Sequence, residues 1–228
     1  MTERPMIPRF SLPTAALLVL LALSPPAALA QPKAYPPPRS LIQQLRDFLG
    51  LTPPIAVGGS RSGGDQQVCL LSPWPIDRMS KGSGSTQAME PLLVGLSAPL
   101  LLAQAPLNEI RLERNEQLLW QQRASSNEAI EGPIPWPISP LRPGELLTLK
   151  LRPRGAAGGD FAVFRLQAAS AANLKANQDQ VVALGSDPRT WYAFLEHLTP
   201  QQASIAAALL SSPNAPTELR EALRCAGP

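Results

Sequence analysis

Acid–base and nucleophilic chemistry near neutral pH depends largely on histidine, and this chain has a single one, His197. His197 lies between Glu196 and Leu198 on a predicted helix. A general base needs a nucleophile within reach, yet the sequence holds no Gly-x-Ser-x-Gly elbow and no Ser-x-x-Lys motif. We therefore expect His197 to have a surface or helix-end role, and we predict no catalytic residue.

Carboxylate pairs and metal ligands are the other candidates for chemistry. Glu128 and Glu131 are of the residue type that glycosidases pair, but they lie among Ser, Asn and Gly, which indicates a solvated loop. A zinc site would have to combine His197 with Cys69 and Cys225, and their spacing is not that of a metal site. The sequence thus predicts no metal, no cofactor and no enzymatic activity.

Two tryptophans have neighbours that suggest a ligand site. Trp74 and Trp136 both lie between prolines, and an exposed Trp beside rigid Pro forms a ledge for peptide or carbohydrate. The alternative is that both rings fill the ends of the fold, as large aromatic side chains usually do. We keep Trp74 and Trp136 as a candidate ligand ledge.

The charges are nearly balanced. The chain has 20 Lys and Arg against 17 Asp and Glu, a formal net charge of +3. Its densest basic stretch alternates with acidic residues, which indicates a solvated surface on strands and makes nucleic acid an unexpected partner. The basic residues are Arg111, Arg114, Arg123, Arg142, Lys150, Arg152 and Arg154, and the acidic ones are Glu109, Glu113, Glu116 and Glu145.

Residues 1–30 have the features of a signal peptide. Two arginines precede an uncharged apolar run at 15–23, two prolines follow it, and Ala28 and Ala30 give the small-x-small pattern before Gln31. The run is too short to span a bilayer before its prolines. We predict cleavage between Ala30 and Gln31 and an exported, periplasmic or secreted protein, with membrane contact only through the uncleaved segment.

Export bears on the two cysteines. An even number of cysteines in an oxidising compartment favours a disulfide between Cys69 and Cys225. Two buried free thiols are the alternative.

Composition divides the remaining chain into four segments. With 44% hydrophobic residues the chain is apolar enough to fold, although its 27 prolines favour short elements. We predict a Pro-rich leader at 31–39, a short amphipathic helix at 40–50, a β-sandwich at 51–168 and a helical segment at 169–228. The fold class is therefore mainly β with an α appendage.

The β segment reads as short strands separated by Pro and Gly turns. Leu112 and Trp120 belong to two alternating runs that form a hairpin, and a three-residue loop ending at Gln117 would pair them, apolar on apolar. Arg142-Pro143-Gly144-Glu145 suits a type II turn, and the Pro-rich run 133–138 cannot be a central strand. This spacing predicts an immunoglobulin-like antiparallel sandwich. The other expected strands are 68–71, 92–96, 99–105, 147–151 and 161–166.

The final segment changes to a helical period. Asp187-Pro188 and Thr199-Pro200 are helix starts, and a third helix begins near Pro216. A further helix is expected near 174–184.

Several short motifs carry a family resemblance. They are residues 56–64 running into 68–70, Leu119-Trp120, Pro135-Trp136-Pro137, residues 141–144 and Trp191-Tyr192. With them the chain resembles, over about residues 55–200, exported proteins of unknown function known chiefly from cyanobacteria, which pair a β-sandwich with a C-terminal helical segment. The resemblance implies an envelope or secreted location and no established activity.

Taken together, the sequence favours a non-enzymatic exported protein that serves as a binding or structural module. Its expected partner is an envelope protein or glycan. An exported sensor that signals to an envelope partner is the alternative, and a glycan or peptide hydrolase is the third.

Overall fold

The computed structural model describes residues 55–58, 66–74 and 91–222. The chain divides into two units, Met1–Tyr35 and Pro36–Pro228, and every described residue belongs to the second. The predicted cleavage site at Ala30 and Gln31, the leader, the helix at 40–50 and Cys225 lie outside the described residues.

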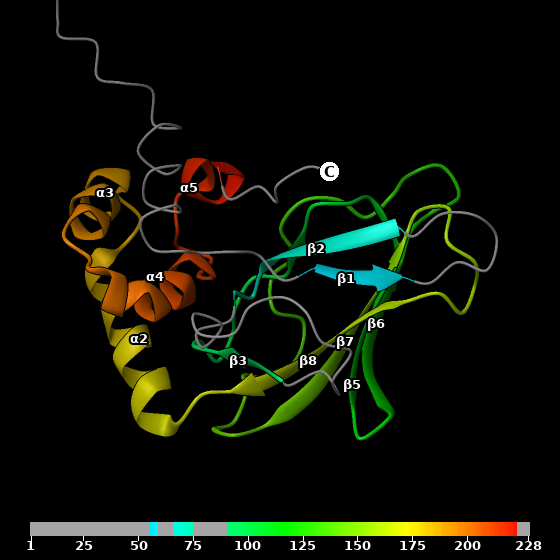
Figure 1. Ribbon diagram of the computed structural model, residues 1–228, viewed down its shortest axis with the longest axis horizontal. Helices are drawn as coiled ribbons and strands as arrows, with labels where there is room; N and C mark the ends of the chain where they lie inside the picture. The colour runs from blue at the N-terminus through cyan, green and yellow to red at the C-terminus, as the bar shows by residue number, and fades with distance from the viewer. Residues whose placement is uncertain (1–54, 59–65, 75–90, 223–228) are drawn as a thin grey trace, which may run out of the picture. The chain divides into compact units, whose positions relative to one another are not determined.

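Two β-sheets form the first half of the described chain (Figure 1). A three-stranded sheet has the order β1-β2-β4, with β1 at Ile55–Gly58, β2 at Gln66–Ser72 and β4 at Leu102–Ala103. A five-stranded sheet has the order β3-β8-β7-β5-β6. Its strands are β3 (Leu92–Val94), β5 (Leu107–Arg114), β6 (Gln117–Arg123), β7 (Leu146–Pro153) and β8 (Ala162–Ala168).

One pairing differs from the predicted antiparallel arrangement. β3 pairs with β8 in parallel, with Leu92 opposite Leu166, whereas the other paired strands run antiparallel. A parallel neighbour needs a long connection, and here the intervening chain forms β4 to β7 before it returns as β8. The direction of a three-residue strand leaves no trace in its hydrophobic pattern, so the sequence could not reveal it.

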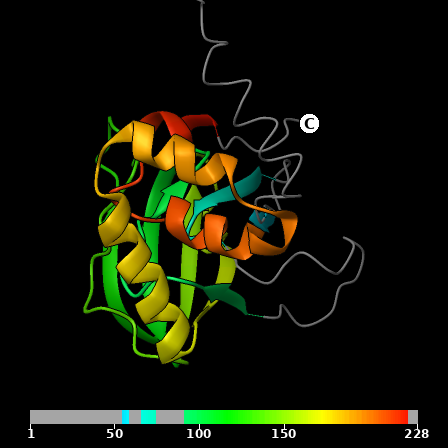
Figure 2. The ribbon, with the colours of Figure 1, turned by 90° about the vertical axis from the view of Figure 1, so that its left-hand side faces the viewer.

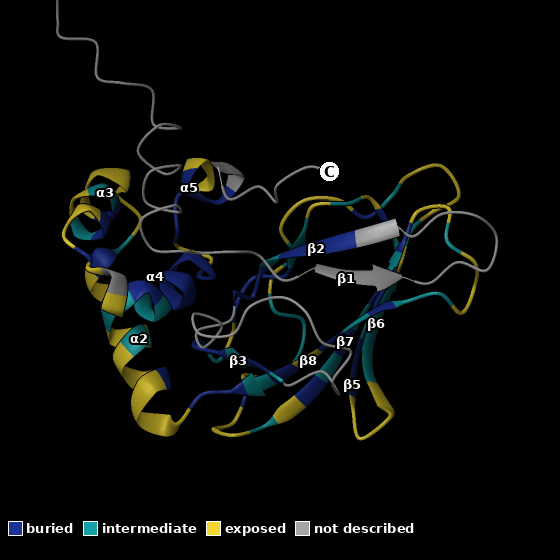
Figure 3. Cartoon of the chain, viewed as in Figure 1, coloured by how far each residue is buried: buried dark blue, intermediate teal, exposed yellow. Residues whose placement is uncertain are grey.

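The two sheets share one apolar core. Val68 and Leu70 of β2 belong to the same buried cluster as Leu112 and Leu149 of the five-stranded sheet. Along β7 and β8 buried residues alternate with more exposed ones, as Figure 3 shows by colour. This alternation directs Leu147, Leu149 and Leu151 inward as predicted, and each fully buried leucine contributes about 1.5–3 kcal/mol.

The β5–β6 hairpin confirms the predicted pairing but corrects its turn. Leu112 is opposite Trp120, as expected, yet Arg114 pairs with Gln117, so the loop has two residues, Asn115 and Glu116. Both have positive φ, 48° and 67°, as a type I′ turn requires. A register shift after Leu112 inserts one extra residue in β6 and restores the apolar pairing. The prediction of a three-residue loop was wrong because it did not allow for this bulge.

Glu116 should be replaceable by glycine with a gain in stability. Its φ of 67° is costly for a side chain with a Cβ and free for glycine. We expect Glu116→Gly to raise the free energy of unfolding by about 0.5–1 kcal/mol, measured by urea denaturation. Glu116→Ala keeps the Cβ and is the matched control. An equal gain from alanine would contradict the turn geometry.

The other predicted turn and the Pro-rich run are as expected. Glu145 N–H donates to the carbonyl of Arg142 over 3.0 Å, and Gly144 has a φ of 74°, which fits a type II turn. Within residues 133–138 the structure forms an isolated bridge from Ile134 to Leu101 and no strand.

The described chain ends in helices α2 (Ala171–Leu184), α3 (Pro188–Glu196), α4 (Ala203–Leu210) and α5 (Thr217–Ala222). Figure 2 shows them gathered in front of the strands. Asp187 caps α3 through a side-chain bond to the N–H of Arg189, as the sequence predicts. These helices enclose a second apolar cluster around the fully buried Trp191. No helix within the described ranges has the length and apolar character needed to cross a membrane.

Thr199-Pro200 does not start a regular α-helix directly. Pro200–Gln202 forms a 3₁₀ turn, and α4 begins only at Ala203. The Gln202 side chain accepts bonds from the N–H and the hydroxyl of Thr199, over 3.0 and 3.1 Å, which holds this turn together. Thr199-Pro200 therefore does mark the start of a helical segment, but the first turn of that segment is a 3₁₀ turn and is tighter than predicted.

Candidate binding surface on the five-stranded sheet

The outer face of the five-stranded sheet, meaning the side turned away from the apolar core, carries a cluster of charged side chains. In β5 the inward Ile110 and Leu112 alternate with outward Glu109, Arg111 and Glu113. The strand register places Arg123 of β6 and Arg152 of β7 on either side of Glu109. The outward residues of these strands include Glu109, Arg111, Glu113, Leu118, Gln121, Arg123, Leu146, Thr148, Lys150, Arg152 and Arg165.

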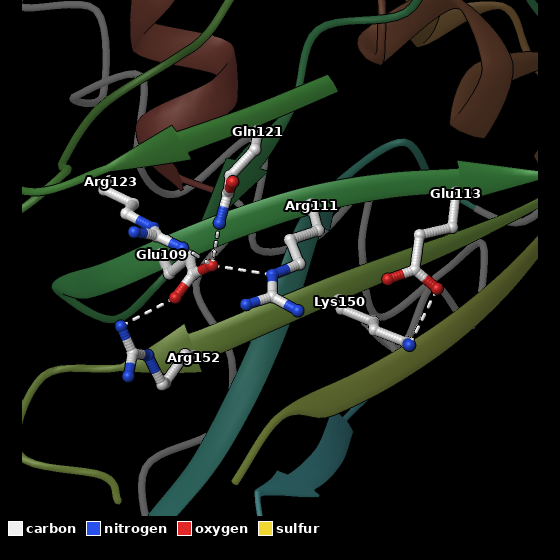
Figure 4. Close-up of polar contacts among 7 residues, drawn as sticks. All are labelled: Glu109, Arg111, Glu113, Gln121, Arg123, Lys150 and Arg152. Atoms are coloured by element: carbon white, nitrogen blue, oxygen red, sulfur yellow. Dashed lines mark hydrogen bonds and ion pairs between the residues drawn. The ribbon is translucent and has the colours of Figure 1, made fainter. Parts of the chain in front are cut away.

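Glu109 is the centre of this surface (Figure 4), and only 2% of its side chain is exposed. Its Oε1 accepts a bond from Arg111 Nε at 2.6 Å and another from Gln121 Nε2, and Arg123 Nε lies 3.6 Å away. Its Oε2 forms an ion pair with Arg152 Nη2 at 2.7 Å. One buried carboxylate therefore holds side chains from three adjacent strands.

The ionisation of Glu109 follows from these contacts. Burial alone would raise its pKa, but hydrogen bonds from Arg111 and Gln121 and the charges of Arg111 and Arg152 outweigh burial and lower the pKa below its usual 4.5. The carboxylate is thus ionised near neutral pH.

A second acidic residue is held in the same way. Glu113 Oε2 pairs with Lys150 Nζ at 2.7 Å, and the Glu113 side chain is 8% exposed against 31% for Lys150. Lys150 stands opposite Arg111 in the register. This ion pair joins β5 to β7 one step further along the strands.

An aromatic ring supports the arginines. The guanidinium carbons of Arg111 and Arg152 lie 4.7 and 5.8 Å from the centre of the Phe161 ring. Such cation–π contacts and the bonds to Glu109 hold both side chains in defined positions. The outer face therefore presents its arginines in a preorganised arrangement.

The sign of the surface follows from unequal exposure. Glu109 and Glu113 are nearly covered, whereas the Arg123 side chain is 67% exposed. Arg165 on β8 is also exposed and faces the same way. The sequence predicted a solvated surface of alternating charges, and this is wrong for the two glutamates. Longer cationic side chains from neighbouring strands cover them, so the face meets solvent as a positively charged surface.

The tryptophan ledge is not formed as predicted. Trp74 is 2% exposed and packs in the helical core, and its backbone N–H donates to Ser211 Oγ over 2.8 Å. Trp136 is partly buried against the sheet core, and its Nε1 donates to the Ser139 carbonyl over 3.2 Å. The two rings belong to different cores, because Trp74 follows β2 directly into the helical layer. They fill the fold, which was the alternative interpretation.

The remaining candidates of the sequence do not meet in one site. Glu128 and Glu131 are exposed and line an open groove of about 440 Å³ together with Arg123. His197 is exposed at the C-terminal end of α3. Its backbone N–H donates to the Phe194 carbonyl, which confirms the helix-end role. Cys69 is buried in β2. The disulfide to Cys225 stays a prediction, since Cys225 is outside the described ranges.

The network around Glu109 was missed at the sequence level. The signal that could have revealed it is the hairpin register, because pairing Leu112 with Trp120 already places Arg123 opposite Glu109. In the part of the chain that the structure describes, no three His, Cys, Asp or Glu side chains gather as metal ligands do.

Comparisons with known proteins add no relative from which a role could be transferred. The chain matches no protein-family model, no curated protein and no solved structure.

Proposed function

We propose that this protein is a non-enzymatic, exported binding module that holds an anionic partner of the cell envelope on the outer face of its five-stranded sheet. The observation that carries the proposal is the unequal burial of opposite charges. Glu109 is almost fully covered, while the Arg123 side chain is 67% exposed and Lys150, which is paired with Glu113, is 31% exposed. A surface of this kind attracts and orients anionic ligands.

A binding role fits the chemistry of Glu109 better than catalysis does. A general acid must hold a proton near neutral pH, whereas the lowered pKa of Glu109 keeps it ionised. Its oxygens are occupied by Arg111, Gln121 and Arg152. The carboxylate therefore serves to position cations.

We further propose that the two sheets form an immunoglobulin-like sandwich. Their shared core and the antiparallel β6-β5-β7-β8 order favour this arrangement. Export rests on the signal-peptide features of residues 1–30.

Co-sedimentation with envelope tests the proposed function. The full chain, expressed with its own N-terminus, is incubated with the envelope fraction of its source cells. We expect salt-sensitive binding that Arg123→Gln/Arg165→Gln weakens, because the variant removes two exposed charges from the outer face. Lys175→Gln/Arg189→Gln removes the same charge from exposed positions on α2 and α3 and is the matched control.

Two results would contradict the proposal. One is envelope binding that both double variants leave unchanged. The other is release of soluble envelope fragments by the wild-type chain and loss of that release in Glu128→Gln, which would indicate a hydrolase.

A further inference from the structure

We infer that the partner of the outer face is an acidic polysaccharide, whose repeated carboxylates lie across strands β6, β5, β7 and β8. This inference rests on the proposed function and names the chemical class of its ligand. It follows from how the cations are held, how they are spaced and how open the face is.

The openness of the face requires a ligand with several charges. Arg123, at 67% exposure, meets an anion from one side only, and Lys150, at 31%, already has Glu113 as an ion-pair partner. Exposed ion pairs of this kind contribute about 0–1 kcal/mol each. A single small anion would therefore bind poorly, whereas a chain with many linked charges gains from each additional contact after the first.

The spacing of the cations suits an extended ligand. Arg123, Arg111 and Lys150 lie on the adjacent strands β6, β5 and β7, and Arg165 follows on β8. Lys150 stands opposite Arg111, whereas Arg123 and Arg165 are each displaced from that level by two residues along the strands, in opposite directions. With neighbouring strands about 4.8 Å apart and a rise of about 3.4 Å per residue, the four positions form a diagonal roughly 20 Å long. A polymer with anionic groups at regular intervals can meet several of them together.

The chemistry of the arginines favours carboxylates. Arg111 and Arg152 already bind the carboxylate of Glu109, and Arg111 donates this hydrogen bond from its Nε. The contact drawn for Arg111 in Figure 4 runs from its Nε to Glu109, so we expect its terminal nitrogens to be the part that meets a ligand. A planar guanidinium matches the planar carboxylate with two parallel bonds.

Two other polyanions fit the surface less well. Single-stranded nucleic acid binding uses exposed aromatic rings for stacking, and Phe161 lies against Arg111 and Arg152 instead. An anionic membrane surface needs a continuous apolar area beside the charges. Leu118 and Leu146, 49% and 42% exposed, lie on non-adjacent strands β6 and β7, separated by β5.

The test uses the full chain with polygalacturonate, neutral dextran and vesicles of anionic phospholipid as probes. We expect binding to polygalacturonate, none to dextran, and affinity that falls as salt rises. Arg123→Gln/Arg165→Gln should weaken the binding about tenfold, because it removes two surface contacts. Lys175→Gln/Arg189→Gln should bind like the wild type.

The outcomes separate this inference from the proposed function. If the arginines are needed for envelope binding but the chain does not bind polygalacturonate, the inference of an acidic polysaccharide is wrong. The proposed function as a binding module is then still supported. Binding to vesicles in place of polygalacturonate leads to the same conclusion and identifies a lipid surface. Failure of both the envelope and the polygalacturonate assay overturns both.

Discussion

Trp74→Ala should lower the free energy of unfolding by about 3–5 kcal/mol, the usual cost of removing a fully buried large aromatic side chain. Trp74 is 2% exposed and lies in one apolar cluster with Val181, Leu184 and Trp191 of the helical layer. Because β2 leads directly into this cluster, the ring joins the sheets to the helices. Urea denaturation followed by circular dichroism measures the effect.

Trp136→Ala is the matched control for this substitution. Trp136 is only partly buried and packs at the margin of the sheet core, so its loss should cost about 1–2 kcal/mol. If the two variants were equally stable, Trp74 would not be the buried link between the layers. A loss of ligand binding in Trp74→Ala at full stability would restore the ledge interpretation.

Glu109→Gln should destabilise the protein by about 2 kcal/mol at neutral pH. Removing one partner of a buried ion pair costs about 3–5 kcal/mol when the other is left buried. Here Arg111 and Arg152 are 29% and 20% exposed, so water replaces part of what they lose. Glu128→Gln, an exposed isosteric change in the adjacent loop, should shift the stability by less than about 0.5 kcal/mol.

The effect of Glu109→Gln should also depend on pH. The pKa of Glu109 is lower in the folded chain than its usual 4.5, so the folded state favours the ionised form. Its stabilising contribution is complete above that pH and is lost as the pH falls toward the folded value. The difference in the free energy of unfolding between the wild type and Glu109→Gln should therefore become smaller as the pH falls from 7 to about 3. A difference in the free energy of unfolding that grows at low pH would contradict a lowered pKa of Glu109 in the folded state.

Local patterns predicted much of the architecture. The alternation of leucines in β7 and the Asp187 cap of α3 were legible, because each depends on residues close in sequence. The parallel β3–β8 pair could not be predicted, because it depends on pairing between segments far apart in sequence. The bulge in β6 could not be predicted either, because it depends on a one-residue insertion. Fold elements of short range can be predicted from single sequences, whereas strand direction and bulges depend on the whole sheet.

The candidate surface shows the same division. The charges of β5 to β7 were visible in sequence, and their burial was not. Whether Glu109 is solvated depends on Arg123 and Arg152, which come from strands on either side. The ledge prediction for Trp74 was wrong for a related reason, because the flanking prolines do not indicate that helices cover the ring.

We propose that the anionic partner binds at the outer face of the five-stranded sheet. The most direct measurement is a nuclear magnetic resonance titration of the arginine Nε–H signals of the full chain with an oligogalacturonate. We expect the signals of Arg111, Arg123 and Arg165 to shift together while that of Arg189 on α3 stays in place. Shifts confined to Arg189, or equal shifts at all exposed arginines, would contradict it.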